Sequence, residues 1–278
     1  MRGGSLLLKA LAYATAILVS LVCLYPFFWM VVSAFRTSKA ILASPLRPWP
    51  ENLSFAVFSD LAQIGGTSLW VYAGNSVLIT TTSTMLSVFI TALGAYALVR
   101  RPDFWLFKAL RMGFMATIMY PYMLLVIPVY LVMYKIGLLG SYAGIVLFLA
   151  VGPIQFFLFE QFFRTLPRSV LEAAVVDGAT ERQILFQVVM PMAAPAVATA
   201  SIITFLLNWS QWLPVLVVSK SPATYTLPVA LMNLNGELGV NFQGIMALSS
   251  LTTLPVIFFF LMTQRRVMTG MTAGAVKG

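Results

Sequence analysis

The chain has 278 residues, of which 60% are hydrophobic and only 9% are charged. An ordinary soluble domain carries about 25% charged residues, so a fully water-facing surface is excluded and we expect the chain to lie in lipid. The net charge of +9 would suggest a nucleic-acid partner in a soluble protein. In a membrane protein the positions of the basic residues matter more, and we predict no nucleic-acid partner.

The sequence contains one cysteine, Cys23, and no histidine. This composition excludes an intrachain disulfide, histidine acid-base catalysis and the usual cysteine or histidine metal sites. We therefore predict no catalytic residue and no bound metal.

Six stretches without Asp, Glu, Lys or Arg are long enough to cross a bilayer, which takes about 20 apolar residues in a helix. The first has no small-residue cleavage pattern after it, so we expect it to be retained as a span. The sequence predicts an all-α membrane protein, with a single transmembrane domain over residues 1–278. The six helices are expected at about 10–35, 70–99, 112–134, 137–160, 192–219 and 243–264.

Basic residues indicate the orientation, because Lys and Arg are enriched in cytoplasmic loops. With a cytoplasmic N-terminus, twelve of the seventeen basic residues lie on the cytoplasmic side. An even number of spans puts both ends on one side, so the N- and C-termini are both predicted to be cytoplasmic. External loops are then expected at 36–68 and 220–242, the second containing a proline-rich loop or re-entrant cap.

The loop between the fourth and fifth spans, residues 164–191, is charged and helix-forming. Pro167 can open a helix, and good helix formers follow from Ser169 to Val176. Gly178 supplies the left-handed residue that closes such a helix. The segment therefore predicts a short helix followed by a glycine turn.

A second helix is expected directly after that turn. Thr180 and Gln183 form a capping-box pattern at its start, and Pro191 and Pro195 predict a bend where it meets the fifth span. On charge and apolar spacing alone, the whole loop is also compatible with a surface hairpin at the membrane interface.

The loop also matches a longer pattern of Glu-Ala-Ala, three residues, Gly, nine residues, an aliphatic, one residue, an aliphatic and Pro. A chance match somewhere in the chain is on the order of a few in ten thousand. The loop therefore resembles that of the permease subunits of binding-protein-dependent ABC importers. The residues that fill the pattern are Glu172, Ala173, Ala174, Gly178, Val188, Met190 and Pro191.

Further segments resemble the carbohydrate-uptake branch of that family, and the resemblance covers about residues 10–278. Asp177 and Ala179 flank the glycine as in that branch. The tail from Thr272 to Gly278 resembles the ending of the shorter permease of the maltose-type transporters. The other similar segments are Asn75-Ser76, Ala95-Tyr96-Ala97 with Arg100, Pro128-Val129-Tyr130 and Gly137-Leu138.

The resemblance implies the type I ABC importer permease fold and one half of a translocation pathway for a sugar or sugar-like solute. The chain has no Gly-x-x-x-x-Gly-Lys-Ser/Thr phosphate loop, so we expect no cofactor on it, and ATP and magnesium on a separate ATPase chain. The implied partners are a second homologous permease in a heterodimer, two copies of a cytoplasmic ATPase, an external or periplasmic solute-binding protein and membrane lipid. The implied location is the bacterial cytoplasmic (inner) membrane.

By the same resemblance, the short helix fits a groove on the ATPase. Small residues allow close approach of helices, the acid Glu172 pairs with a basic residue and fixes register, and Asp177 ties the turn or caps the next helix. The implied ATPase-coupling residues are Leu171, Glu172, Ala173, Ala174, Asp177, Gly178 and Pro191. In the C-terminal tail, Gly274, Lys277 and Gly278 are implied to reach the ATPase, although a disordered end explains the tail equally well.

The fifth predicted span carries a polar and aromatic cluster, and polar groups at such depth are usually functional or face the bundle. The family pattern has Asn and an acid after the tryptophan, whereas this chain has Ser and Gln. Hydrogen bonding to a partner permease explains the cluster as well as a substrate path does. The candidate substrate-path residues are Asn208, Trp209, Ser210 and Gln211; the run 80–84 is interpreted as packing.

The alternative function is an ion-coupled secondary transporter of a small polar solute. It needs ionisable residues at mid-membrane and a repeat between halves, and the sequence shows neither. A further alternative is an intramembrane enzyme, but the sequence shows no histidine, no paired carboxylates and no activated nucleophile for it. Four of the eight acids, Glu160, Glu172, Asp177 and Glu181, fall in one stretch, which we expect to meet another protein.

Overall fold

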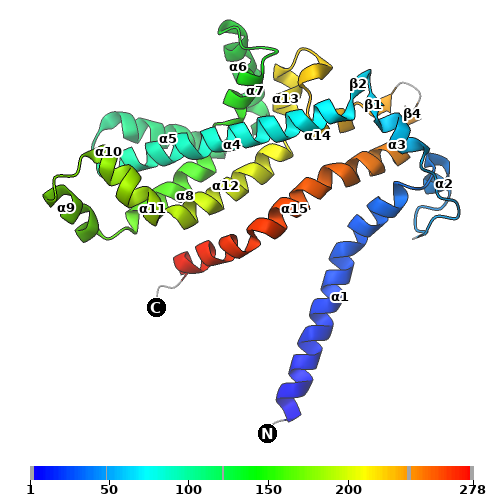
Figure 1. The fold of residues 1–278 in the computed structure, drawn as a ribbon, viewed down its shortest axis with the longest axis horizontal. Helices are drawn as coiled ribbons and strands as arrows, with labels where there is room; N and C mark the ends of the chain where they lie inside the picture. Colours follow the sequence, from blue (N-terminus) through cyan, green and yellow to red (C-terminus); the bar gives the residue numbers. More distant parts are fainter. Residues whose placement is uncertain (1–2, 48, 121, 237–238, 276–278) are drawn as a thin grey trace. The chain divides into compact units, whose positions relative to one another are not determined.

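The computed structural model describes residues 3–47, 49–120, 122–236 and 239–275, with side chains over 8–47, 49–120, 123–234 and 241–263. The backbone divides into two compact units (Figure 1). One unit consists of Met1–Trp70 and Ala230–Pro255, and the other of Val71–Val229 and Val256–Gly278.

The first unit contains one long helix and several short elements. Gly65 and Gly66 both have positive φ, 58° and 77°, as a two-residue hairpin turn requires, and they join the antiparallel pair β1–β2. A second pair, β3–β4, is also antiparallel, so two short hairpins accompany the predicted helices. The elements are α1 (Gly3–Ser33), α2 (Ser38–Ala43), α3 (Ala56–Leu61), β1 (Gln63–Ile64), β2 (Thr67–Ser68), β3 (Asn235–Gly236) and β4 (Gly239–Val240).

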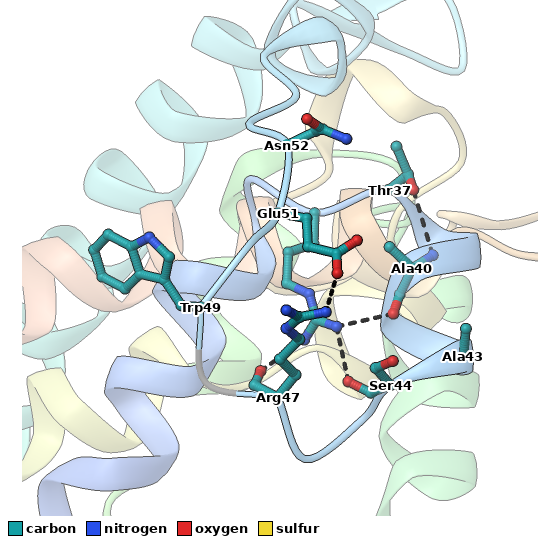
Figure 2. Close-up of a pocket in the computed structure, with 9 residues that line it drawn as sticks. Thr37, Ala40, Ala43, Ser44, Arg47, Trp49, Glu51 and Asn52 are labelled. Atoms are coloured by element: carbon teal, nitrogen blue, oxygen red, sulfur yellow. Dashed lines mark hydrogen bonds and ion pairs between the residues drawn. The ribbon is translucent and has the colours of Figure 1, made fainter.

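A buried arginine shapes the segment after α1. Arg36, only 3% exposed, donates from Nη2 to the carbonyl oxygens of Ala40 at 2.8 Å and Ser44 at 2.7 Å, and from Nη1 to that of Arg47 at 3.0 Å. The last carbonyls of a helix lack intrahelical donors, so the guanidinium satisfies the end of α2. Figure 2 shows Ala40 and Ser44 on the wall of a pocket of about 230 Å³.

The second unit is a bundle of helices, and α4, α14 and α15 belong partly to each unit. Within it α8 packs against α5 and α12, and α13 against α6 and α7. The elements are α4 (Leu69–Arg100), α5 (Trp105–Met119), α6 (Tyr122–Lys135), α7 (Tyr142–Leu149), α8 (Pro153–Arg164), α9 (Arg168–Val176), α10 (Glu181–Gln183), the π-helix η1 (Ile184–Val189), α11 (Met190–Met192), α12 (Ala194–Trp209), α13 (Leu213–Val218), the 3-10 helix η2 (Pro222–Thr224), α14 (Leu227–Met232) and α15 (Phe242–Ala275).

Small residues lie at the centre of this bundle. Ala95 of α4, Ala193 and Ala200 are completely buried, together with Phe159 of α8 and Val189 of η1. Alanines let helix backbones approach closely, as at many membrane helix interfaces. The cluster therefore packs α4, α8, η1 and α12 around one apolar core.

Helix length and composition identify three candidate membrane spans in the described residues, Leu8–Ser33, Leu69–Arg100 and Phe242–Thr263. Two bent pairs also qualify: α7 with α8, bent by 48°, and Glu181–Met192 with α12, bent by 75°. These give up to five spans. The count of six stays a prediction.

The predicted third helix, 112–134, is not continuous. α5 ends at Met119 and α6 begins at Tyr122, because Tyr120 adopts an extended conformation with ψ 138°. Tyr120 precedes a proline in the sequence, and the residue before a proline disfavours the helical region. An absence of charge does not reveal such a break.

The predicted fourth and fifth helices are also interrupted. The fourth breaks between Leu149 and Pro153, and the fifth between Trp209 and Leu213. Each new helix carries a proline at its start, where the missing N–H costs nothing. Both breaks therefore follow proline chemistry inside apolar sequence.

The close packing of α7 gives a prediction for Gly144→Ala. The added Cβ would lie 2.3 Å from the carbonyl oxygen of Leu138 and 3.2 Å from Val218 Cγ1. Overpacking against backbone typically costs about 1–3 kcal/mol. We expect a lower melting temperature of the purified protein and less protein in the membrane.

Gly113→Ala in α5 is the matched control, because no atom lies within 4 Å of its added Cβ. Alanine stabilises a helix by about 1 kcal/mol relative to glycine, so this variant should be at least as stable as the parent. Equal melting temperatures for Gly144→Ala and the parent would contradict the close approach.

Candidate functional site

The predicted coupling helix is α9, which runs from Arg168 to Val176 after Pro167 at its N-cap. Leu171 and Ala174, one turn apart, pack against the apolar core of the second unit, whereas Glu172 and Ala173 are exposed. Only Ala173 of the two adjacent alanines is thus exposed for a close approach by a partner. Figure 1 shows α9 at the end of the bundle, beside α10.

Gly178 closes α9 as predicted, with φ 79°. Its N–H donates to the carbonyl of Val175 at 3.0 Å, and the N–H of Ala179 donates to that of Ala174 at 3.0 Å. This pair of bonds is the Schellman arrangement, which satisfies the last carbonyls of a helix. Backbone hydrogen bonds therefore fix the turn at both Gly178 and Ala179.

The predicted capping box opens α10. Thr180 N–H donates to Gln183 Oε1 at 2.8 Å, and Gln183 N–H donates to Thr180 Oγ1 at 3.4 Å. The following segment is a π-helix, in which Met190 N–H reaches the carbonyl of Leu185 five residues back. It is followed by Pro191, which lacks an N–H to continue the hydrogen-bond ladder. The 75° bend to α12 confirms the predicted bend.

Two acids of this region lie outside the core, one in α9 and one at its C-cap. Asp177 and Glu172 are exposed, and neither carboxylate has a hydrogen-bond or ion-pair partner among the described residues. Asp177 was expected to tie the turn or cap α10; the hydroxyl of Thr180 caps it instead, because this side chain immediately precedes the first helical residue.

Glu181, by contrast, accepts hydrogen bonds from two side chains of α4. Its Oε2 accepts from Tyr96 Oη at 2.8 Å and Arg100 Nε at 3.2 Å, and its Oε1 accepts from Arg100 Nη2 at 2.5 Å. The hydrogen bonds from Arg100 hold the pKa of the Glu181 carboxyl below its usual value. The carboxylate is therefore ionised at neutral pH and the pair keeps its charge.

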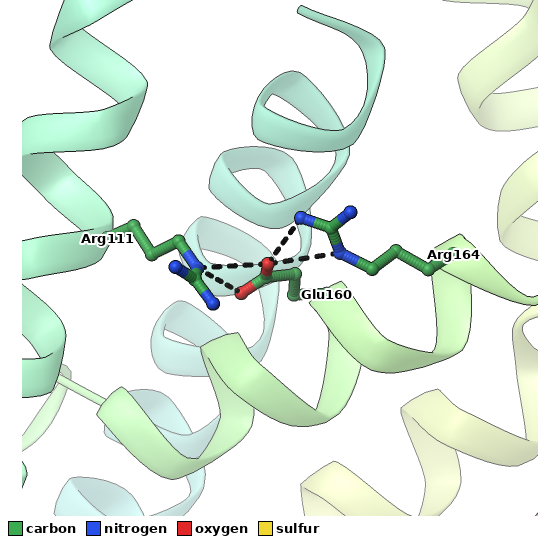
Figure 3. A network of polar contacts seen from close by, with 3 residues as sticks. All are labelled: Arg111, Glu160 and Arg164. Atoms are coloured by element: carbon green, nitrogen blue, oxygen red, sulfur yellow. Dashed lines mark hydrogen bonds and ion pairs between the residues drawn. The ribbon is translucent and has the colours of Figure 1, made fainter. Parts of the chain in front are cut away.

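Glu160 is the centre of a second network (Figure 3). This carboxylate, with a side chain only 5% exposed, accepts from Arg111 Nε of α5 at 3.1 Å and from Arg164 Nη2 of its own helix at 2.8 Å. Both guanidinium groups are about half exposed. The network ties α5 to the end of α8 at which the inner loop begins.

These two networks correct one expectation from the sequence. The stretch that contains all four acids between 160 and 181 was expected to meet another protein, but within it Glu160 and Glu181 bind basic residues of this chain. Arg111 lies 49 positions from Glu160, and Arg100 lies 81 positions from Glu181. The remaining pair, Glu172 and Asp177, is available to a partner.

The other end of α4 is anchored to the segment before α14. Asn75 Nδ2 donates to the carbonyls of Ala223 at 2.8 Å and Tyr225 at 2.9 Å, and its Oδ1 accepts from Tyr142 Oη at 2.8 Å. The neighbouring Ser76 hydroxyl accepts the N–H of Leu227 at 2.8 Å. These contacts explain why a polar pair stands inside an apolar helix.

The candidate substrate-path residues are partly engaged within the chain. Asn208 Nδ2 donates to Ser83 Oγ at 3.0 Å and to the carbonyl of Leu149 at 3.4 Å. Trp209 is buried and stacks on Phe205. Ser210 is exposed and Gln211 half-buried. Within the 80–84 run, Thr80, Ser83 and Thr84 are buried.

The predicted tail contacts are only partly within the described residues. Gly274 belongs to the backbone of α15, whereas Lys277 and Gly278 lie outside the described residues. Over the described part of the chain, no group of three or more Cys, Asp or Glu residues is arranged to hold a metal ion.

Three comparisons with known proteins bear on this geometry. Residues 87–272 match the family model of binding-protein-dependent transport system inner membrane components. The permease protein DasC of the diacetylchitobiose uptake system of Streptomyces coelicolor is 30% identical over 269 residues, covering 95% of each chain. The trehalose/maltose transport system permease protein MalG of Thermococcus litoralis is 28% identical, again over 95% of each.

Solved structures show the same fold. A chain of a bacterial ABC transporter involved in the import of the acidic polysaccharide alginate superposes with a TM-score of 0.78 at 21% identity, covering 95% of this chain and 98% of that one. A chain of the MetNI methionine ABC transporter superposes with a TM-score of 0.57 over 73% of this chain. The helical fold is therefore the permease fold of ABC importers.

The family match covers about two thirds of the chain and includes the whole inner loop. It confirms the predicted transport role in place of an enzyme, and it gives no support to the ion-coupled alternative. This chain belongs to the family of binding-protein-dependent transport system inner membrane components, and it is a multi-pass permease subunit of an ABC transporter in the bacterial inner membrane.

Proposed function

We propose that the chain forms half of the translocation pathway of an ATP-driven importer for a sugar or sugar-like solute, delivered by an external binding protein. This substrate class is supported by the solutes in the names of the relatives, which match this chain over nearly their full length. They include permeases for diacetylchitobiose, arabinooligosaccharides and trehalose/maltose. Because these solutes differ widely, they support a class of cargo and not one sugar.

In the membrane, six spans with both termini in the cytoplasm agree best with the sequence. Twelve of seventeen basic residues then lie inside, as cytoplasmic enrichment of Lys and Arg requires. The sixth span is the divided segment α5–α6, which adds to the five candidates given by helix length. In this arrangement α9 faces the cytoplasm and the Asn75 anchor faces outside.

The proposed partners are a second homologous permease, two copies of an ATPase that binds ATP and magnesium, and the solute-binding protein. The exposed face of α9 is the proposed ATPase contact. Val176 at its end is 86% exposed, and Glu172 and Ala173 lie on the same open side. This side therefore offers a partner an apolar residue and a carboxylate that has no partner among the described residues. Tail residues Gly274, Lys277 and Gly278 are proposed as a second contact.

The transport mode itself is tested by reconstituting the purified complex with its binding protein in proteoliposomes. We expect uptake of a sugar identified by thermal-shift screening of the binding protein, and we expect it to require ATP inside the vesicle. Uptake that persists without ATP and collapses with an ionophore would instead establish the ion-coupled transporter.

The coupling surface is tested by Glu172→Ala. Glu172 has no hydrogen-bond or ion-pair partner among the described residues. The substitution should therefore change the free energy of unfolding by less than about 0.5 kcal/mol. We expect uptake to fall at least tenfold through weaker ATPase association, measured by co-purification, while solute capture by the binding protein stays normal.

Asp60→Ala is the matched control. Asp60 is likewise exposed and unpaired among the described residues, but it lies in the segment predicted to be external. Its removal should change neither uptake nor ATPase association. Normal uptake in Glu172→Ala would show that α9 is not the contact.

A further inference from the structure

α4 is held by polar contacts near both of its ends. Tyr96 and Arg100 stand four residues apart, on one face of the helix, and grip Glu181 of the inner loop. Asn75 and Ser76 hold the segment that leads into α14. The two contacts are separated by roughly 37 Å along the helix, at 1.5 Å per residue.

The backbone of Glu181 is joined to α9 by a short turn held by backbone and side-chain hydrogen bonds. The Schellman turn at Gly178 and the capping box at Thr180 fill the whole interval between α9 and Glu181. A displacement of α9 is therefore passed to the backbone of Glu181 through an ordered turn, and the carboxylate carries it to Tyr96 and Arg100. Its bidentate contact with Arg100 fixes direction as well as distance.

Apolar contacts between the loop and α4 cannot replace this grip. η1 shares the apolar core with α4, but packed apolar faces of helices tolerate small sliding motions. The Tyr96–Arg100–Glu181 contact, called the clamp below, sets the register between them. Tyr96 is itself oriented by an edge-to-face contact with Phe163 of α8, with ring centroids 6.2 Å apart.

The clamp is poorly explained as a stabilising device. The Glu181 side chain is 58% exposed and that of Arg100 27%, and exposed ion pairs contribute little stability. A contact that holds geometry without holding the fold together is suited to transmitting movement. Its removal should then alter coupling more than folding.

We propose that α4 is a relay between the ATPase side and the external side of this permease, with Glu181 as a positioning residue at one end and Asn75 at the other. When the ATPase moves α9, the clamp draws the end of α4 with it. The Asn75 anchor then moves the segment from Ala223 to Leu227. This inference rests on the proposed ATPase contact at α9.

The test uses the complete importer in proteoliposomes and measures solute transported per ATP hydrolysed. In Glu181→Gln and in Asn75→Ala we expect this ratio to fall about three- to tenfold, with the ATPase still bound. Distant, independent sites affect free energies additively. In a relay, however, the double variant should be no worse than the worse single variant.

The relay would be overturned if the loss in the double variant equalled the product of the losses in the two single variants. It would also be overturned if both single variants kept the parental ratio of solute transported to ATP hydrolysed. Release of the ATPase by Glu181→Gln would also overturn it, by placing Glu181 in the docking surface. Asp103→Asn is the matched control, since the fully exposed carboxylate of Asp103 pairs with Lys108 near the same end of α4. It should leave the ratio unchanged.

Two milder variants keep the proposal testable where a polar deletion prevents assembly. Tyr96→Phe and Tyr142→Phe each remove one hydroxyl from a relay contact and keep the ring. We expect each to lower the ratio about two- to threefold. Parental ratios in both would overturn the relay.

Glu172→Ala, measured in parallel, separates the relay from the proposed function. If Glu172→Ala releases the ATPase while the clamp variants keep the parental ratio, the relay is wrong and the coupling surface stands. If Glu172→Ala binds the ATPase normally while the clamp variants lower the ratio, ATPase binding does not require Glu172 and the coupling from Glu181 to Asn75 stands.

Discussion

The hydrocarbon of the membrane supplies no water to satisfy backbone polar groups, and the fold of this chain depends on that constraint. A helix satisfies these groups within its own segment, and breaks in a membrane helix are tolerated only where protein covers them. The break after α7 meets this condition. Gly152 is buried, and a Cβ there would lie 2.4 Å from both Ser87 Oγ and Gln155 Oε1, so polar side chains of α4 and α8 lie directly against it.

The same constraint accounts for Asn208. Leu149 is the last residue of α7, so its carbonyl lacks an N–H donor from a following turn of the same helix. The Asn208 amide reaches this carbonyl at 3.4 Å and Ser83 at 3.0 Å. An amide deep in an apolar helix thus serves the packing of α4, α7 and α12. Of the cluster 208–211, the polar groups of Ser210 and Gln211 are the better candidates for contact with a passing solute.

The inner loop could be predicted from sequence because its signals are local. Pro167, Gly178 and the Thr180–Gln183 pair each act within one or two helical turns, and each occupies the predicted position in the structure. The clamp and the Glu160 network could not be predicted in this way. The Arg100–Glu181 and Arg111–Glu160 contacts join residues 81 and 49 positions apart, and a single sequence contains no local signal for such pairing. Only the Glu160–Arg164 pair, four residues apart on α8, has a local signal.

Counting uncharged stretches failed in a similar way at the helix breaks. The method detects what lipid tolerates, and a break made by proline inside apolar sequence carries no charge. Tyr120 before a proline, and the prolines that open α8 and α13, were visible in the sequence. Whether such a proline starts a new helix or kinks an existing one depends on the neighbours that cover it, and those come from distant segments.

The two flanks of α9, with Glu160 at the entry and Glu181 at the exit, are held by ion pairs of unequal strength. At the entry, the nearly buried Glu160 lies between two arginines, so losing a donor leaves a desolvated charge and costs about 1–3 kcal/mol. At the exit, the exposed Glu181 pair contributes about 0.2–1 kcal/mol. The entry is therefore the costly end to displace. In the proposed relay, movement of α9 is therefore expressed at the exit, where Glu181 contacts α4.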